Sequence, residues 1–171
     1  GTDWNREHTF PNSLASPKLE DDIFAYADAH NLRPADVDMN GSRGNLKFAA
    51  GSGNSGSVSG GWYPGDEWRC DAARIIMYMY LRLGNRCYPS FATDGSTNAF
   101  DINMIDLLLD WNSIDPVSEI EDKRNTYHAN TSNTYAQGNR NPFIDNPYLA
   151  TVIWGGTPAQ DRWNTTPDTE V

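Results

Sequence analysis

The sequence predicts an α+β fold in a single domain. Short extended segments, "EHTF" and "HNLRP", lie in the first 50 residues among Asn, Asp and Pro residues that favour turns. After residue 66, apolar residues recur at helical spacing. A chain of 171 residues fits one domain and can bury most of its apolar surface. We therefore expect small strands near the N-terminus and a mainly helical remainder.

Residues 1–171 are expected to form this single domain, in which an Asn/Asp/Pro-rich stretch of about 50 residues is followed by a Gly/Ser-rich loop at 51–61, a helical part at 66–136 and a turn-rich tail at 137–171. A short helix is predicted from Pro34 to Asn40, because Pro favours the first helical position and Gly41 favours the end. The loop "GSGNSGSVSGG" is predicted to be a flexible connector, since it has nothing to pack into a core and lacks the Lys-Ser/Thr of a phosphate-binding loop.

Three helices are predicted after the loop. The first, "DEWRCDAARIIMYMYLRLG", begins with acids and ends at Gly84, and it is apolar on most sides, which indicates a central helix. The second runs through "DINMIDLLLDWNSI", and the third starts at Asp115-Pro116, an N-cap followed by a first-turn Pro. If the first helix is continuous, Cys70 and Cys87 lie roughly 20 Å or more apart, too far for a disulfide, so free thiols are expected.

The charge is acidic but unevenly distributed. The net charge of −10 argues against an anionic partner for the protein as a whole. However, residues 101–122 carry seven carboxylates and no Lys or Arg, whereas residues 69–86 carry four Arg and one acid. A local basic surface is therefore compatible with the acidic total. No segment is long and apolar enough to span a bilayer.

Residues suited to phosphodiester chemistry occur in three pieces, "NREH" at 5–8, "DAHNLRP" at 28–34 and "MNGSRGNLKF" at 39–48. Glu7 and Asn40 offer hard oxygen ligands of the kind that Mg²⁺ prefers, and His8 can accept a proton near neutral pH. Adjacent side chains of a strand point to opposite faces, so Glu7 and His8 can serve one site only at a strand end or bend. The spacing alone leaves an ordinary surface Glu-His pair open. A zinc site is disfavoured, because the chain has neither HExxH nor a Cys pair.

Longer motifs give this constellation a family context. The segments "WNREHTFP", "HNLRP" and "NGSRGN" resemble successive signatures of the endonuclease I family, the bacterial periplasmic and extracellular non-specific nucleases. The segments "GDEWRCDAARIIMYMYLR", "LLLDWNSIDPVSEIEDKRN" and "QGNRNPFID" are similar to its remaining blocks, in order, to about Pro147. The family belongs to the ββα-metal (His-Me finger) nucleases, in which two short strands and a helix hold one divalent ion. The resemblance thus implies a finger core at about 5–48.

The resemblance also implies roles for single residues. His8 would be the general base, and Glu7 and Asn40 would hold Mg²⁺, with Mn²⁺ or Ca²⁺ substituting in binding. Cleavage by this route leaves 5′-phosphate and 3′-hydroxyl ends. Because His8 must be neutral to accept a proton, activity is expected to fall below a pKa near ~6.5.

Cationic candidates for contacting phosphate are fewer than the family leads one to expect. Family members can bring a phosphate-clamping Arg from the loop between the finger strands, but residues 9–29 contain only Lys18. Arg43, three residues beyond Asn40, is the favoured catalytic contact. Arg74 lies on an otherwise apolar helix, where it could either pair with a buried acid or point into the cleft. Both alternatives stay open. The candidates for substrate binding besides Arg43 are Arg6, Arg33 and Arg74.

Other polar residues are expected to be structural. Asn31 and Asn45 should stabilise the finger by hydrogen bonds, and His30 should be a structural histidine. His128 is expected to be exposed to solvent. The segment "QGNRNPFID" should pack as an ordered loop against the finger, with Arg140 forming a structural pair.

These expectations point to a Mg²⁺-dependent endonuclease, a phosphodiester hydrolase that acts on DNA and also, as an alternative, on RNA with little sequence specificity. Because cations are few, nucleic-acid affinity should be modest and salt-sensitive. We expect a monomer, secreted or periplasmic; no signal peptide is present, which is uninformative in a chain that opens on Gly-Thr. Two alternatives remain. One is a phosphodiesterase using the same finger on a non-nucleic substrate, and the other is a catalytically silent extracellular glycan-binding module, which the aromatic content and acidic pI favour.

Overall fold

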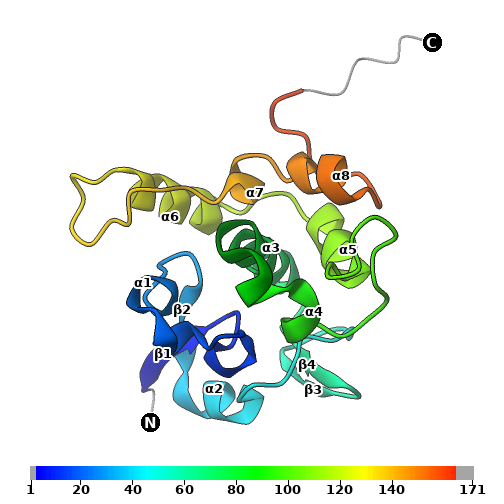
Figure 1. The fold of residues 1–171 in the computed structure, drawn as a ribbon, viewed down its shortest axis with the longest axis horizontal. Coiled ribbons are helices and arrows are strands. Elements are labelled where there is room, and N and C mark those ends of the chain that lie inside the picture. Colours follow the sequence, from blue (N-terminus) through cyan, green and yellow to red (C-terminus); the bar gives the residue numbers. More distant parts are fainter. Residues whose placement is uncertain (1–2, 165–171) are drawn as a thin grey trace.

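The computed structural model describes residues 3–164 and has an α+β architecture, as predicted. Near the N-terminus, strands β1 (Trp4–His8) and β2 (Leu32–Asp36) form an antiparallel pair, and helix α2 (Val37–Arg43) follows directly. Figure 1 shows this ββα unit on one side of the molecule and the longer helices on the other. The segment between the strands is not extended: it contains 3-10 turns at Asn12–Leu14 and Leu19–Asp21 and helix α1 (Ile23–Tyr26).

The predicted helix at Pro34–Asn40 is wrong in its position. Pro34 lies within β2, where the two-stranded sheet makes every strand an edge that tolerates a residue without an N–H. Helix α2 instead begins after Asp36. The Asp36 side chain accepts hydrogen bonds from the amides of Asp38 and Met39, at 3.0 and 3.1 Å. The helix continues through Gly41 and ends at Gly44, which has a φ of 54°.

The predicted flexible connector at 51–61 is also corrected. It contains strand β3 (Gly56–Val58), which pairs with β4 (Gly61–Tyr63) in an antiparallel hairpin. A Cβ at Gly61 would lie 2.2 Å from the carbonyl oxygen of Lys47, so only glycine permits this close backbone approach. The amide of Trp62 donates to the same carbonyl at 2.8 Å, which fixes the hairpin to the residues that follow α2.

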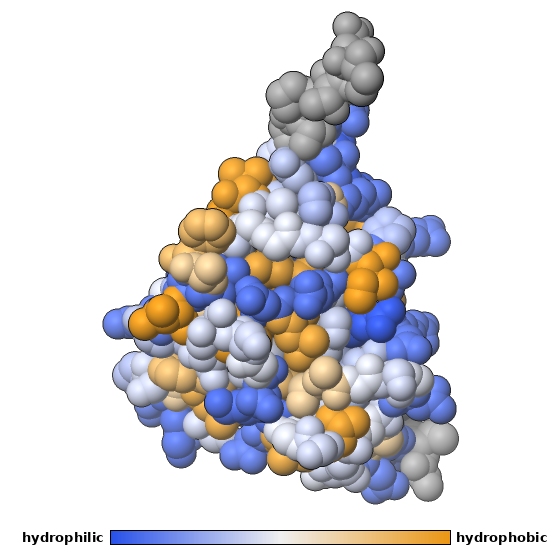
Figure 2. All heavy atoms as spheres, turned by 90° about the vertical axis from the view of Figure 1, so that its right-hand side faces the viewer, coloured by the Kyte–Doolittle hydropathy of each residue, from blue (hydrophilic) through white to orange (hydrophobic). Residues whose placement is uncertain are grey.

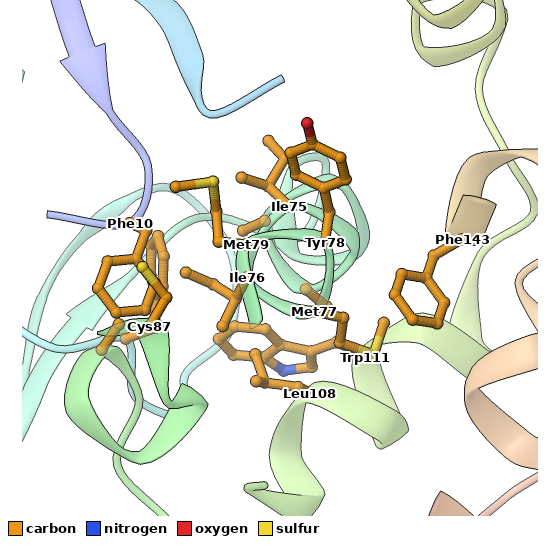
Figure 3. Packing of buried hydrophobic residues seen from close by; sticks show 14 of the residues in the cluster. Phe10, Ile75, Ile76, Met77, Tyr78, Met79, Cys87, Leu108, Trp111 and Phe143 are labelled. Carbon is orange, nitrogen blue, oxygen red and sulfur yellow. The ribbon is translucent and has the colours of Figure 1, made fainter. Parts of the chain in front are cut away.

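The central predicted helix is confirmed as α3 (Arg69–Leu83), which ends at Gly84 with a φ of 57°. Its apolar side chains pack against those of α5 and of the segment after residue 140, and Figure 3 shows Ile76 and Met77 beside Leu108, Trp111 and Phe143. The remaining elements are a 3-10 turn at Gly84–Cys87 and the helices α4 (Pro89–Ala92), α5 (Asp106–Ile114), α6 (Glu119–Ala129), α7 (Pro142–Asp145) and α8 (Tyr148–Trp154).

Two helix starts differ from their predictions. Helix α5 begins at Asp106, because residues 101–104 form a turn closed by a 3.0 Å backbone hydrogen bond. Helix α6 begins after Ser118, because Ser118 and Glu121 cap its first turn reciprocally, and Asp115 stays extended. The tail is less turn-rich than predicted, since it contains α7 and α8; its residues 165–171 lie outside the described part of the chain.

Cys70 and Cys87 are both buried free thiols, as predicted. Figure 2 shows the side of the molecule at the right of Figure 1, where apolar patches are interrupted by hydrophilic surface, a common pattern for a folded chain. Among residues 3–164, no helix has both the length and the apolar character needed to cross a membrane.

Candidate active site

The carboxylate of Glu7 is held at the end of β1 by Arg43. The Arg43 guanidinium forms an ion pair with Glu7 and also donates to the carbonyl oxygens of His8 and Thr9, at 3.2 and 2.8 Å. The guanidinium also lies over the Phe48 ring, with its carbon 4.3 Å from the ring centroid. Burial lowers the pKa of Arg43, while the charge and hydrogen bond of Glu7 oppose that shift. Arg43 is only 5% exposed. The structure therefore places it to position Glu7, and it offers little surface for the predicted phosphate contact.

Asn40 lies on the same side of the ββα unit as Glu7. Its side-chain nitrogen donates to Asn5 Oδ1 at 2.7 Å and to the Arg6 carbonyl at 3.5 Å. Residues 5 and 7 share one face of β1, and residues 40 and 43 share one face of α2. The two faces meet, because Asn40 bonds Asn5 while Arg43 bonds Glu7. This contact leaves Glu7 Oε2 and Asn40 Oδ1 without hydrogen bonds among the described residues.

His8 is the last residue of β1, so the condition that Glu7 and His8 lie at a strand end is met. Its Nε2 lies 2.8 Å from the carbonyl oxygen of Tyr26, and the two rings are 4.4 Å apart. A carbonyl can only accept, so this contact places the proton on Nε2 and leaves Nδ1 with a lone pair. Burial lowers the pKa of His8, with the Tyr26 hydrogen bond opposing it. A neutral imidazole with one basic nitrogen is thus favoured near pH 7.

Arg6 lies on the His8 side of the strand rather than the Glu7 side. Its guanidinium carbon is 5.3 Å from the centroid of the Tyr26 ring, and the residue is exposed. Its positive charge also contributes to the lowered pKa of His8. Glu7 and His8 are therefore supported from opposite sides, by α2 and by α1, although their Cα atoms are only about 3.8 Å apart.

The chain from residue 1 to residue 148 matches the family model described as Endonuclease I. The chain belongs to the endonuclease I family. The resemblance seen in the sequence motifs is thereby confirmed. An extracellular ribonuclease of Bacillus amyloliquefaciens is 37% identical over 168 residues, covering 89% of this chain and 54% of that protein. An extracellular ribonuclease of Bacillus subtilis (strain 168) is 38% identical over 162 residues, with the same coverage of 89% and 54%. The chain thus spans about half the length of these curated relatives.

Asn31 and Asn45 of this endonuclease I family member form the kind of contacts predicted for them. Asn31 is fully buried, accepts from the Phe10 amide at 2.7 Å and donates to the Phe10 carbonyl at 3.1 Å. It therefore ties the start of β2 to the chain leaving β1. Asn45, which follows α2, donates to Ser13 Oγ at 3.3 Å.

Arg74 is completely buried and pairs with an acid, the first of the two alternatives stated for it. Its guanidinium contacts both carboxylate oxygens of Glu121, at 2.8 and 3.0 Å, and also Asn112 Oδ1 at 3.1 Å and the Asp115 carbonyl at 2.5 Å. Every one of these partners lies in the helical part. Arg74 thus has no exposed surface with which to bind substrate.

The loop after α6 packs against the ββα unit. The Ala29 amide donates to Gln137 Oε1 at 2.7 Å, and His30 Nε2 lies 3.2 Å from the Asn139 carbonyl. Arg140 forms a bidentate pair with both carboxylate oxygens of Asp145, as expected of a structural residue. The prediction that His128 is exposed is wrong, because its ring packs 5.5 Å from that of His30.

The His30–His128 pair predicts a loss of stability in mild acid. Burial lowers the pKa of both rings below 6.5, and nearby arginines contribute for His128. Below about pH 6.5 these two histidines therefore bind more protons in the unfolded chain than in the folded one. The contribution of the neutral histidines to the free energy of unfolding is thus present above about pH 6.5, and it is lost as the pH falls through their pKa values in the folded state. Urea unfolding from about pH 8 to about pH 5 should show this decline. A His30→Gln/His128→Gln variant should show a shallower one; an equal slope would contradict the expectation.

Proposed function

We propose that this chain is a metal-dependent endonuclease that hydrolyses phosphodiester bonds of nucleic acids, with β1, β2 and α2 as its ββα-metal finger. The observation that carries the proposal is the pairing at the end of β1: a neutral His8 oriented by the Tyr26 carbonyl beside a Glu7 carboxylate oriented by Arg43. Membership of the endonuclease I family supports the same chemistry.

Glu7 and Asn40 would hold the divalent ion. Each side chain has one oxygen fixed in position by the hydrogen bonds of its other atom, and both oxygens are hard donors that suit Mg²⁺. No cluster of three His, Cys, Asp or Glu ligands occurs in the described residues. The two oxygens of Glu7 and Asn40 fit an ion that keeps several waters and is held by only one or two protein groups. The ion would supply stabilisation of the negative charge on the phosphate and the leaving oxygen. Mn²⁺ or Ca²⁺ would substitute in binding.

His8 would act as the general base. Nδ1 takes a proton from a water molecule, which attacks phosphorus in line with the 3′ oxygen of the preceding nucleotide. The Tyr26 carbonyl keeps the imidazole in the required tautomer and stabilises the positive charge that forms on the ring. As the new P–O bond forms, the bond between phosphorus and the 3′ oxygen breaks, and the leaving oxygen takes up a proton from solvent water. The products therefore carry 5′-phosphate and 3′-hydroxyl ends.

We propose both DNA and RNA as substrates. The nucleophile in this route is water rather than a 2′-hydroxyl, so the chemistry does not depend on which sugar is present. The two Bacillus relatives are named extracellular ribonucleases, which supports RNA as a substrate and secretion as the destination of this chain. A monomer suffices for the route, because all its groups come from one chain.

Removal of the metal gives the direct test. Purified protein should nick plasmid DNA and shorten a single-stranded RNA in Mg²⁺, lose both activities in EDTA, and recover them when Mg²⁺ is added in excess. The reason is that the Glu7 and Asn40 oxygens cannot by themselves stabilise the negative charge that develops on the phosphate during attack. Cleavage of a chromogenic phosphodiester without cleavage of either nucleic acid would favour the phosphodiesterase alternative. Absence of all three activities would favour a binding module.

A further inference from the structure

Most cations of this acidic chain are already paired. Of its thirteen Lys and Arg, nine lie within 4.0 Å of a carboxylate, and all thirteen are among the described residues. Arg33 on β2 and Arg124 on α6 are among the four without such a partner. Both residues are half-buried, so each keeps part of its surface exposed to solvent.

The two guanidinium groups lie side by side. Arg33 Nη1 and Arg124 Nη2 donate to the same carbonyl oxygen, that of Leu32, at 3.3 and 3.0 Å. Arg124 also donates to the Ala29 carbonyl at 3.0 Å, and its Nε is buried without a partner among the described residues. Burial and then the charge of Arg124 lower the pKa of Arg33 to about 10. Two unpaired like charges in contact are a costly arrangement that a bound anion would relieve.

The nearest acid does not neutralise this pair. Asp71 on α3 attracts both guanidinium groups but lies beyond 4.0 Å from each, and its Oδ2 has no hydrogen-bond partner in the described part of the chain. Burial and then the charge of Glu121 raise the pKa of Asp71, which weakens its hold on the arginines further.

One member of the pair comes from the strand that is paired with the candidate site. Arg33 is directly opposite Glu7 in the β1–β2 register. Residues in such a cross-strand pair share one face of the sheet, with Cβ atoms about 4.5–5.5 Å apart. Arg124 reaches the same place from α6, on the helical side. The segment between the two strands adds no unpaired cation, because Lys18 lies 3.5 Å from Glu20.

We propose that Arg33 and Arg124 together bind a backbone phosphate of the nucleic acid adjacent to the phosphate that is cleaved. The inference rests on the proposed function and adds a substrate contact that spans the ββα unit and α6. Two planar guanidinium forks held side by side match the several oxygens of one phosphate group. They would fix the register of the strand relative to His8 without reading its sequence.

Binding without cleavage tests this subsite. A fluorescein-labelled short single-stranded DNA, and the RNA of the same sequence, would be titrated by fluorescence anisotropy in EDTA at several NaCl concentrations. Arg33→Gln and Arg124→Gln should each weaken binding about tenfold, as expected for the loss of one charge-assisted contact. Each should also reduce the slope of log K against log[salt] by about 0.7. Lys123→Gln, which removes the same charge one residue away on the solvent side of α6, should change neither quantity.

A purely structural role gives a different pattern. If Arg124 only braces Leu32 and Ala29, Arg124→Gln lowers the Tm but leaves the salt slope of the folded protein unchanged, and the proposal is overturned. Arg124→Lys, which keeps the charge without the fork, should retain the slope and lose affinity. If Arg124→Gln does not fold, Arg33→Gln decides, because it loses a single hydrogen bond to the backbone.

The outcomes separate the subsite from the activity. Wild-type cleavage with unchanged binding by the arginine variants would remove the subsite and leave the proposed function standing. Wild-type binding with the expected arginine effects, but without Mg²⁺-dependent cleavage, would remove the proposed function alone.

Discussion

Replacing His8 by alanine is expected to lower kcat for both DNA and RNA cleavage by about 10²–10⁴-fold, the usual contribution of a positioned general base. The loss should fall on kcat rather than on KM, since the imidazole is supported by Tyr26 and the proposed phosphate contacts come from other residues. The variant loses one hydrogen bond, so its free energy of unfolding should fall by only about 1 kcal/mol. Circular dichroism and urea unfolding would verify that the fold is retained.

The pH profile identifies the base more specifically. Burial lowers the pKa of His8, so wild-type activity should persist somewhat below pH 6.5 and then decline as the ring becomes protonated. The residual activity of His8→Ala should lack this acidic limb, and added imidazole should restore part of the rate. His128→Ala is the matched control: it removes a half-buried histidine away from β1 and should keep both kcat and the limb. Full activity in His8→Ala would reject the assignment.

The part of the fold that the sequence predicted correctly was encoded locally, since the apolar pattern and Gly84 define α3 within one continuous segment. The proposed pair Glu7 and His8 was visible in the sequence because the two residues are neighbours in the chain. Asn40 could be assigned only through the family motif, because its contact with Asn5 spans 35 positions.

What was missed depends on distant contacts. Arg124 gave no local signal, since its partner Leu32 is 92 positions away. The β3–β4 hairpin is held in place by the backbone of Lys47, which lies outside the glycine-rich segment. The segment by itself therefore has the composition of a flexible connector. The start of α6 differs, because its signal is local: Ser118 and Glu121 have the spacing of a capping box, whereas the Asp115-Pro116 pattern predicts an earlier start.

Glu121 both caps the first turn of α6 and forms the buried ion pair with Arg74. We therefore expect substitution of Arg74 to have a large effect on the free energy of unfolding. Replacing Arg74 by Met is expected to reduce the free energy of unfolding by about 3–5 kcal/mol, because Glu121 keeps a buried charge without its partner. The loss also leaves Asn112 Oδ1 and the Asp115 carbonyl without the donor that satisfied them.

A double variant isolates the charge. Arg74→Met/Glu121→Gln removes both charges, and Gln is still able to complete the capping box with Ser118. It should recover most of the lost stability, so the two substitutions should be strongly non-additive in urea unfolding. Well below the Tm, both variants should cleave with a KM within a few-fold of wild type, since Arg74 is completely buried. An Arg74→Met protein that is as stable as wild type but has a raised KM would instead return Arg74 to the substrate-binding cleft.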